Sequence, residues 1–133
     1  MADQARTVSI TPMLTVRNAA AAIDFYRQAF DATEEERFVS PNGQIVAQMA
    51  IDGADFYVVD ENPAAFNHSP EALGGTSVRM NLIVEDADRS TAEAIAAGAT
   101  EVFPIDDQPY GMRQGRVQDP YGHHWLIGTP LKS

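Results

Sequence analysis

The feature that most limits the possible folds of this chain is a pattern that occurs twice. In each copy an alternating apolar segment, typical of a strand, is followed by a helical periodicity and then by three further short strand-like segments. Leu14 and Asn18 in the first copy correspond to Leu82 and Asp86 in the second, at the same offset of 68 residues (82 − 14 = 68). A fixed offset between two such series indicates a duplicated module. We therefore expect two β-α-β-β-β modules, which make an α+β fold.

Local signals divide each module into elements. Asn18 and Asp86 are suited to cap helices, because their side chains accept hydrogen bonds from the free N–H groups of a first turn. In the first module, residues 9–61, we expect a strand over 8–16, a helix over 19–30 and strands over 34–39, 44–51 and 54–60. In the second module, residues 77–131, we expect a strand over 77–84, a helix over 87–97 and strands over 100–105, 114–118 and 123–128.

The segment between the modules has a different composition. Residues 62–76 are rich in Pro, Asn, Ser and Gly, which is typical of a loop, and a short helix is expected around Glu71. We expect this loop to join both modules into a single domain over residues 1–133.

The last predicted hairpin has a well-defined turn. Pro120 presets φ, and Gly122 takes a positive φ without strain. A three-residue loop with Gly122 in the left-handed conformation pairs Asp119 with His123. Val117 then opposes Trp125 on the helix side, and the face away from the helices carries Arg116, Gln118, His124 and Leu126.

The same hairpin carries a resemblance to a known family. Gly111 and Arg113 precede a strand, the turn reads D-P-Y-G over 119–122, and His123 and Trp125 follow it. This arrangement resembles the closing hairpin of the glyoxalase/bleomycin-resistance/dioxygenase superfamily, or vicinal oxygen chelate (VOC) proteins, and is most similar to the PhnB-like branch. The resemblance implies that the two modules form a curved, partly open mixed β-sheet barrel around a shared cleft.

Composition excludes several classes of function. With 19 acidic against 9 basic residues and a net charge of -10, the chain is a poor partner for a phosphate backbone, so we expect no nucleic-acid binding. The absence of cysteine excludes disulfides and thiolate metal sites. No apolar run has the length of a membrane span, and the polar segment 1–7 lacks a signal-peptide core. We therefore expect a cytoplasmic protein without membrane partners.

Strand alternation also predicts which side chains line the cleft. A two-residue turn at 52–53 places Gln48 opposite Tyr57, and opposite residues share a face. An adaptable apolar pocket is suggested by Met13, Met49, Tyr57, Tyr110 and Met112. The predicted ligand contacts are Met13, Gln48, Tyr57, Arg79, Asn81, Tyr110, Met112, Gln118 and His124.

Two arginines have alternative interpretations. Arg79 is expected to be buried in the cleft and to need a partner. This partner is either an internal carboxylate such as Asp55 or Glu61 or an anionic or carbonyl group of a ligand. Arg113, like Tyr110, lies before the last hairpin and either guards the mouth of the cleft or belongs to the ordinary surface.

The resemblance also defines positions for a metal. Members with metal take four ligands, and alignment of the strand motifs places Thr11, Tyr57, Arg79 and Leu126 there. Leu has no donor atom and Arg repels a cation, so we expect no bound metal and no cofactor. His123 and His124 are adjacent on a strand and point to opposite faces, so they do not chelate one ion together.

Three functions remain open at this point. The first is a metal-free protein that binds a small molecule, a drug or a metabolite, in the cleft. The second is a metal-independent isomerase or lyase, with His124 or Tyr57 as the acid/base and Arg79 holding an anion. The third is a structural homologue without ligand that only dimerises. In each case we expect a homodimer, because open sheets leave apolar surface for a symmetric partner to cover.

Overall fold

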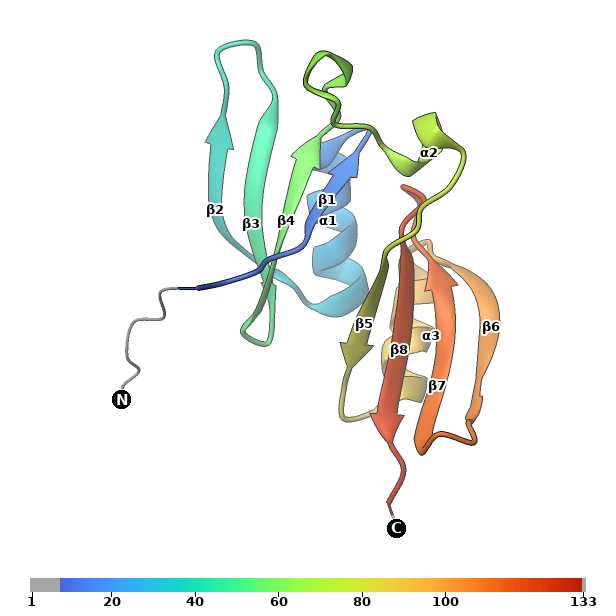
Figure 1. Ribbon diagram of the computed structural model, residues 1–133. Helices are drawn as coiled ribbons and strands as arrows, with labels where there is room; N and C mark the ends of the chain where they lie inside the picture. The colour runs from blue at the N-terminus through green and yellow to red at the C-terminus, as the bar shows by residue number, and fades with distance from the viewer. Residues whose placement is uncertain (1–7, 133) are drawn as a thin grey trace.

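The computed structural model describes residues 8–132 and contains two four-stranded sheets, each with a helix on one side (Figure 1). The first sheet has the order β1-β4-β3-β2, with β1 parallel to β4 and the other neighbours antiparallel. Its elements are β1 (Met13–Val16), α1 (Ala19–Phe30), β2 (Thr33–Val39), β3 (Ile45–Ile51) and β4 (Ala54–Asp60).

The second sheet repeats this topology in the order β5-β8-β7-β6, with β5 parallel to β8. Its elements are β5 (Arg79–Ile83), α3 (Ala87–Ala97), β6 (Thr100–Asp107), β7 (Met112–Gln118) and β8 (His124–Pro130). The predicted α+β fold of two β-α-β-β-β modules is therefore confirmed. Within residues 8–132 no strand ladder joins the two sheets, so the barrel is not closed.

Both long helices begin and end at the predicted residues. Asn18 accepts a hydrogen bond from the backbone N–H of Ala21, and Asp86 accepts one from that of Arg89. Each cap satisfies a donor that the first turn leaves free. After α3, Gly98 takes a positive φ of 131°, where a side chain would be strained.

The linker contains two short helical turns. The helix expected around Glu71 is present as α2 (Pro70–Leu73), capped by the side chain of Ser69. The 3-10 turn η1 (Pro63–Ala65) was not predicted. Arg17 forms a salt bridge with Glu71 at 2.6 Å and donates to the carbonyl oxygen of Pro120 at 3.0 Å, so the linker is attached to both modules.

The first strand is shorter than expected. It was predicted over 8–16 but begins at Met13. Pro12 has no N–H group and therefore interrupts the ladder, although its carbonyl oxygen accepts from the N–H of Tyr57 at 2.8 Å. The polar segment 1–7, which entered the expectation about signal peptides, lies outside the described residues. No helix among the described residues has the length and apolar character needed to span a membrane.

The core connects the two modules through α1. Tyr26 and Phe30 on this helix, Phe56 on β4 and Trp125 on β8 form an aromatic cluster with ring centroids 4.5–6.3 Å apart. Trp125 is only 2% exposed, which confirms its prediction as a core residue. Because α1 also packs along α3, the helices form one contiguous layer and each sheet keeps one face away from it. These two faces are called the open faces.

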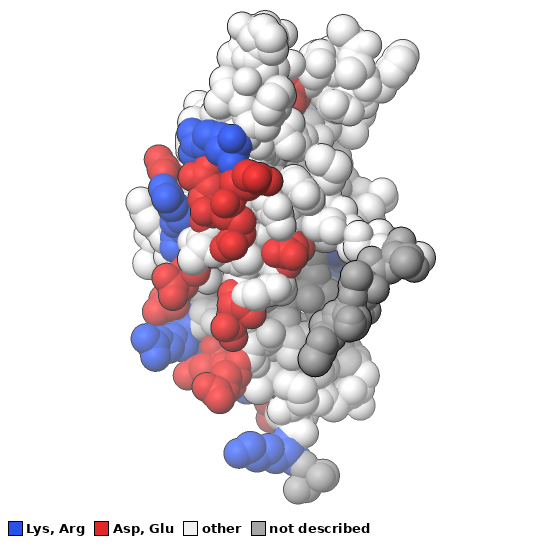
Figure 2. All heavy atoms as spheres, turned by 90° about the vertical axis from the view of Figure 1, so that its left-hand side faces the viewer, with Lys and Arg blue, Asp and Glu red and all other residues white. Residues whose placement is uncertain are grey.

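Charge is distributed unevenly over this layered structure. Figure 2 shows acidic and basic side chains gathered along the helix side of the molecule, whereas the side toward the open face of the first sheet is largely uncharged. On that open face Met13 is 57% and Phe38 62% exposed. Exposed apolar side chains on a sheet face indicate a surface that another molecule covers.

Candidate functional site

Strand register places a set of polar side chains on the open face of the second sheet. Arg79, His124 and Gln118 form one row across β5, β8 and β7. The next row contains Asn81, Leu126, Arg116 and Phe103. Val117 opposes Trp125, and Asp119 donates its N–H to the carbonyl oxygen of His123 at 2.8 Å, so the predicted hairpin register is confirmed.

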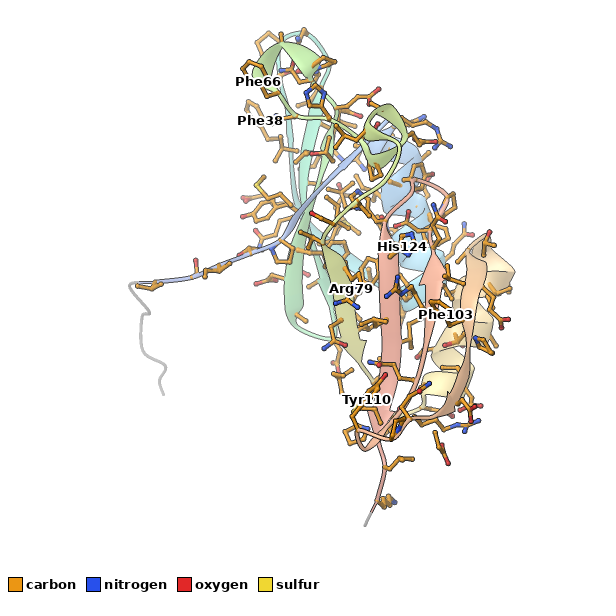
Figure 3. The ribbon with its side chains drawn as sticks, turned by 45° about the vertical axis from the view of Figure 1, so that its right-hand side comes forward. Phe38, Phe66, Arg79, Phe103, Tyr110 and His124 are labelled. Atoms are coloured by element: carbon orange, nitrogen blue, oxygen red, sulfur yellow. The ribbon has the colours of Figure 1, made fainter. Side chains whose placement is uncertain are left out.

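An open cavity of about 370 Å³ lies on this face, and from these rows only Arg79, Leu126, Arg116 and Phe103 line it. Figure 3 shows Arg79, His124, Phe103 and Tyr110 spread over this side of the second sheet. The residues that line the cavity are Arg79, Phe103, Pro104, Asp106, Gln108, Tyr110, Gln114, Gly115, Arg116 and Leu126. The lining therefore combines guanidinium, amide, phenol and apolar groups.

Hydrogen bonds hold one wall of the cavity in place. The hydroxyl of Tyr110 donates to Oε1 of Gln114 at 2.6 Å, and Nε2 of Gln114 donates to Oδ1 of Asn81 at 3.4 Å. Gly128 on β8 has no side chain, so it leaves room for the side chain of Gln114 and for the end of that of Met112. Tyr110 is 64% exposed although its hydroxyl is engaged, so its ring remains available at the rim.

The open face of the second sheet also carries two buried polar atoms without partners within residues 8–132, one on Arg116, which lines the cavity, and one on His124, which does not. Arg116 lies with its guanidinium 5.6 Å from the ring centroid of Phe103, and its buried Nε–H has no hydrogen-bond acceptor among the described residues. Nδ1 of His124 is also buried without a partner there. Burial, followed by the positive charge of Arg116, lowers the pKa of His124 below its ordinary value. This histidine is therefore neutral near pH 7.

The predicted ligand contacts divide between the two open faces. Arg79, Asn81, Tyr110, Met112, Gln118 and His124 belong to the second module. Met13, Gln48 and Tyr57 form a row on the first sheet, where Gln48 opposes Tyr57 as predicted. A separate cavity of about 240 Å³ lies on that face and includes Met13, Thr15 and Val46. Tyr57 and Arg79 lie on different sheets, and neither of these two cavities contains both of them.

Several expectations about individual residues were wrong. Met49 is fully buried opposite Phe56 in the core, because it alternates with Gln48, and so it lines no open face. Arg79 is exposed, and the salt bridges of residues 8–132 include none from Arg79 to Asp55 or Glu61. Asp55 and Glu61 belong to the first module, and Arg79 begins the first strand of the second.

Arg113 has a structural role that the sequence left open. Its guanidinium contacts Asp88 at the start of α3 and Asp107 at the end of β6, at 2.7 Å and 2.9 Å. Hydrogen bonds to these carboxylates raise the pKa of Arg113. Arg113 therefore joins α3 to the β6–β7 turn, away from the cavity.

Of the predicted contacts only Arg79 and Tyr110 line this cavity, and eight of its lining residues were not selected, among them Arg116, Phe103 and Gln114. Arg116 had been placed on the correct face by the hairpin register, but it was not selected. Phe103 enters the cavity because β6 has a bulge on each side of it, between Glu101 and Phe103 and between Phe103 and Asp106. Bulges shift alternation by a residue, so simple alternation from Thr100 could not place it. Gln114 was predicted only as the start of a strand.

Metal-binding groups are sparse on these faces. No cluster of three or more His, Asp or Glu side chains suited to a metal ion occurs in the part of the chain that the structure describes. Among the positions aligned with metal ligands, Thr11 precedes β1, Tyr57 lies on β4, and Arg79 and Leu126 lie on β5 and β8.

Fold and site together define a class of protein: a pair of β-α-β-β-β modules with a polar cavity on an open sheet face. Residues 8–127 match the Glyoxalase/Bleomycin resistance protein/Dioxygenase superfamily, and the chain belongs to this superfamily.

Several relatives support this assignment. An uncharacterized protein of Mycobacterium bovis is 41% identical over 128 residues, which cover 93% of this chain and 84% of the relative. The crystal structure of TioX from a Micromonospora species is 25% identical, with a TM-score of 0.69, and the match covers 95% of this chain and 98% of that one. A PhnB protein of Bacillus cereus, 19% identical over 92% of this chain and 99% of its own, has the same fold with a TM-score of 0.67.

Proposed function

We propose that this protein binds a small molecule, a metabolite or a drug, on the open face of the second sheet. The observation that carries the proposal is the cavity of about 370 Å³ in which Arg79, Phe103, Tyr110, Arg116 and Leu126 meet. A concave surface with apolar walls and a few convergent polar groups is the usual form of a ligand site. The polar groups orient the ligand, and the aromatic rings provide contact area.

The proposed binding does not involve a metal ion. At the positions where metal-dependent relatives would place ligands, Leu126 offers no donor atom and Arg79 has a permanent positive charge. A phenol hydroxyl such as that of Tyr57 is a poor ligand for a divalent cation. This donor set does not fit a metal, so the function that we propose contains no metal-dependent step.

The complete site is proposed to form in a homodimer. Arg79, Asn81, Tyr110, Met112, Gln118 and His124 would contact the ligand from one chain, and Met13, Gln48 and Tyr57 from a second copy. Support comes from the apolar open face of the first sheet, where Met13 and Phe38 are more than half exposed. Placing this face over the second sheet of another copy would cover both open faces at once.

A metal-independent isomerase or lyase is the second candidate, and His124 favours it. Its pKa is lowered, so the ring is neutral near pH 7, and its Nδ1 is buried without a partner beside Arg79. A neutral imidazole next to a cationic group is suited to take a proton from a carbon acid whose developing anion the cation stabilises. Chemical conversion of a bound compound would distinguish this candidate from simple binding.

The test combines a metabolite and drug library with a matched pair of variants. Compounds that raise the melting temperature of the wild-type protein are re-measured on Phe103→Ala, which removes a cavity wall, and on Phe66→Ala, an exposed position on the linker. We expect Phe103→Ala to lose most of the ligand-induced shift and Phe66→Ala to keep it. A library without a single stabilising compound, or equal loss in both variants, would contradict the proposal. Mass spectrometry of the recovered compound then reports whether it was converted.

A further inference from the structure

The distribution of ion pairs in this acidic protein singles out two arginines. Five arginines of residues 8–132 form salt bridges with Asp or Glu, and most of these lie on the helix side or the sheet edges. Arg79 and Arg116 form none within the same residues, although the chain has 19 acidic side chains. These two arginines lie on one face and are therefore free to bind the anionic group of another molecule.

Both arginines line the same cavity. Arg79 lies on β5 and Arg116 on β7, on either side of β8, so their long side chains reach the cavity from opposite flanks of Leu126. Asp106 is the one carboxylate among the lining residues. It lies on β6 and pairs with Gln114, which is two residues from Arg116 on β7. Its Oδ1 already accepts the N–H of Asp107 at 2.8 Å. The cavity is therefore positive at one end and negative at the other.

Arg116 is the stronger indication of the two. Its guanidinium lies near the ring of Phe103, and its Nε–H is buried without an acceptor among the described residues. A buried donor that remains unsatisfied carries a free-energy cost, because its hydrogen bond to water is lost and not replaced. A carboxylate that accepts from this Nε–H and from a terminal N–H together would remove that cost, because the guanidinium edge matches two carboxylate oxygens.

We propose that the cavity holds a monoanionic ligand whose carboxylate lies between Arg79 and Arg116 and whose flat apolar part rests on Phe103 and Leu126. The negative Asp106 end disfavours a second anionic group on the same ligand. This inference rests on the proposed small-molecule function and specifies its chemical class, an aromatic or otherwise planar carboxylate.

The experiment uses benzoate as probe and benzamide as its neutral analogue, at constant ionic strength and pH 7. Binding is followed by NMR on the isotope-labelled full chain through the Nε–Hε signal of Arg116, assigned by its loss in Arg116→Gln. In that variant the backbone amide signals of Phe103 and Leu126, which line the cavity, report binding instead. We expect saturable shifts in the millimolar range with benzoate and none with benzamide. Arg79→Gln and Arg116→Gln should each weaken benzoate binding roughly tenfold or more. Arg89→Gln, on α3 and paired with Glu93, is the matched control and should leave it unchanged.

Three other outcomes would contradict the inference, and the measurements distinguish them. Absent or benzamide-like binding excludes a site for the carboxylate. If Arg79→Gln and Arg116→Gln instead dissociate a dimer and leave benzoate binding unchanged, the arginines pair with carboxylates of a second copy. If library compounds stabilise the wild type and both arginine variants equally, the protein binds small molecules and only the anion site is wrong. Melting curves of all variants establish that each is folded.

Discussion

At the scale of single residues, Asp119 has a larger role than its turn position suggests. Its carboxylate is 3% exposed and accepts four hydrogen bonds. Two come from the backbone N–H groups of Tyr121 and His123, at 2.9 Å and 3.0 Å. The others come from the Tyr26 hydroxyl at 2.5 Å and Nε1 of Trp125 at 3.0 Å. Burial and the nearby Asp119 charge raise the pKa of Tyr26, so its hydroxyl stays protonated and donates.

Asp119→Asn should therefore destabilise the protein although it nearly preserves shape. The amide nitrogen cannot accept from Trp125, and one buried donor loses its partner. We expect Asp119→Asn to lower the free energy of unfolding by about 2–3 kcal/mol. Tyr26→Phe, which removes one hydrogen bond, should lower it by about 1 kcal/mol. Urea unfolding measures both. A change below about 0.5 kcal/mol for Asp119→Asn, the size of an ordinary surface effect, would show that the network contributes little.

His124 provides a second residue-scale prediction, on pH. Arg79 on β5, Arg116 on β7, His123 and Asp119 surround it, and burial and Arg116 lower its pKa. The folded state then binds fewer protons than the unfolded one as pH falls below 6.5, so the His124 contribution lowers stability toward acid pH. NMR titration of the imidazole nitrogens should give a midpoint below 6.5, and His124→Gln should remove this component from the pH dependence of unfolding. A midpoint at or above 6.5 would contradict the burial of this ring.

At the scale of elements, the β6–β7 pair depends on one glycine. A Cβ added at Gly115 would lie 2.8 Å from both the backbone N of Ile105 and the carbonyl oxygen of Phe103. These are backbone atoms at the bulge that directs Phe103 into the cavity, so they cannot move aside as a flexible side chain does.

Gly115→Ala should therefore cost about 1–3 kcal/mol of stability and disturb the cavity. Gly128→Ala is the matched comparison, because its added Cβ would meet the flexible ends of Met112 and Gln114 at 2.9–3.2 Å. We expect Gly128→Ala to have the smaller effect in thermal and urea unfolding. Equal effects would mean that the bulge adapts as easily as those side chains.

At the scale of the whole molecule, the open face of the first sheet predicts a homodimer. Phe38 is 62% exposed on this face beside Val46, and Val39 next to it is 52% exposed on the other side of the strand. Sedimentation of the wild type should give twice the 14.5 kDa of one chain at micromolar concentration. Phe38→Glu should shift the equilibrium toward the monomer, because a charge would be desolvated in the interface. Val39→Glu, on the other side of the strand, should leave the dimer intact. A wild-type monomer, or equal dissociation of both variants, would contradict a dimer formed through this open face.

The sequence by itself was sufficient for what depends on local chemistry. Periodicity and caps at Asn18 and Asp86 determined both long helices, and turn residues determined the register of the last hairpin. These features involve residues within a few positions of one another. The duplicated pattern then arranged the predicted elements into two β-α-β-β-β modules. The D-P-Y-G turn was predicted for the same reason, from Pro120 and Gly122.

Only the tertiary structure decided which predicted contacts share a surface. Tyr57 and Arg79 satisfy the same alternation rule, yet they lie on different sheets, because no strand ladder joins the two modules within residues 8–132. Phe103 reaches the cavity through bulges that alternation does not describe. The four hydrogen bonds of Asp119 connect residues up to 93 positions apart in the chain. Such long-range placement results from packing the helices and the aromatic core, and no local sequence signal contains it.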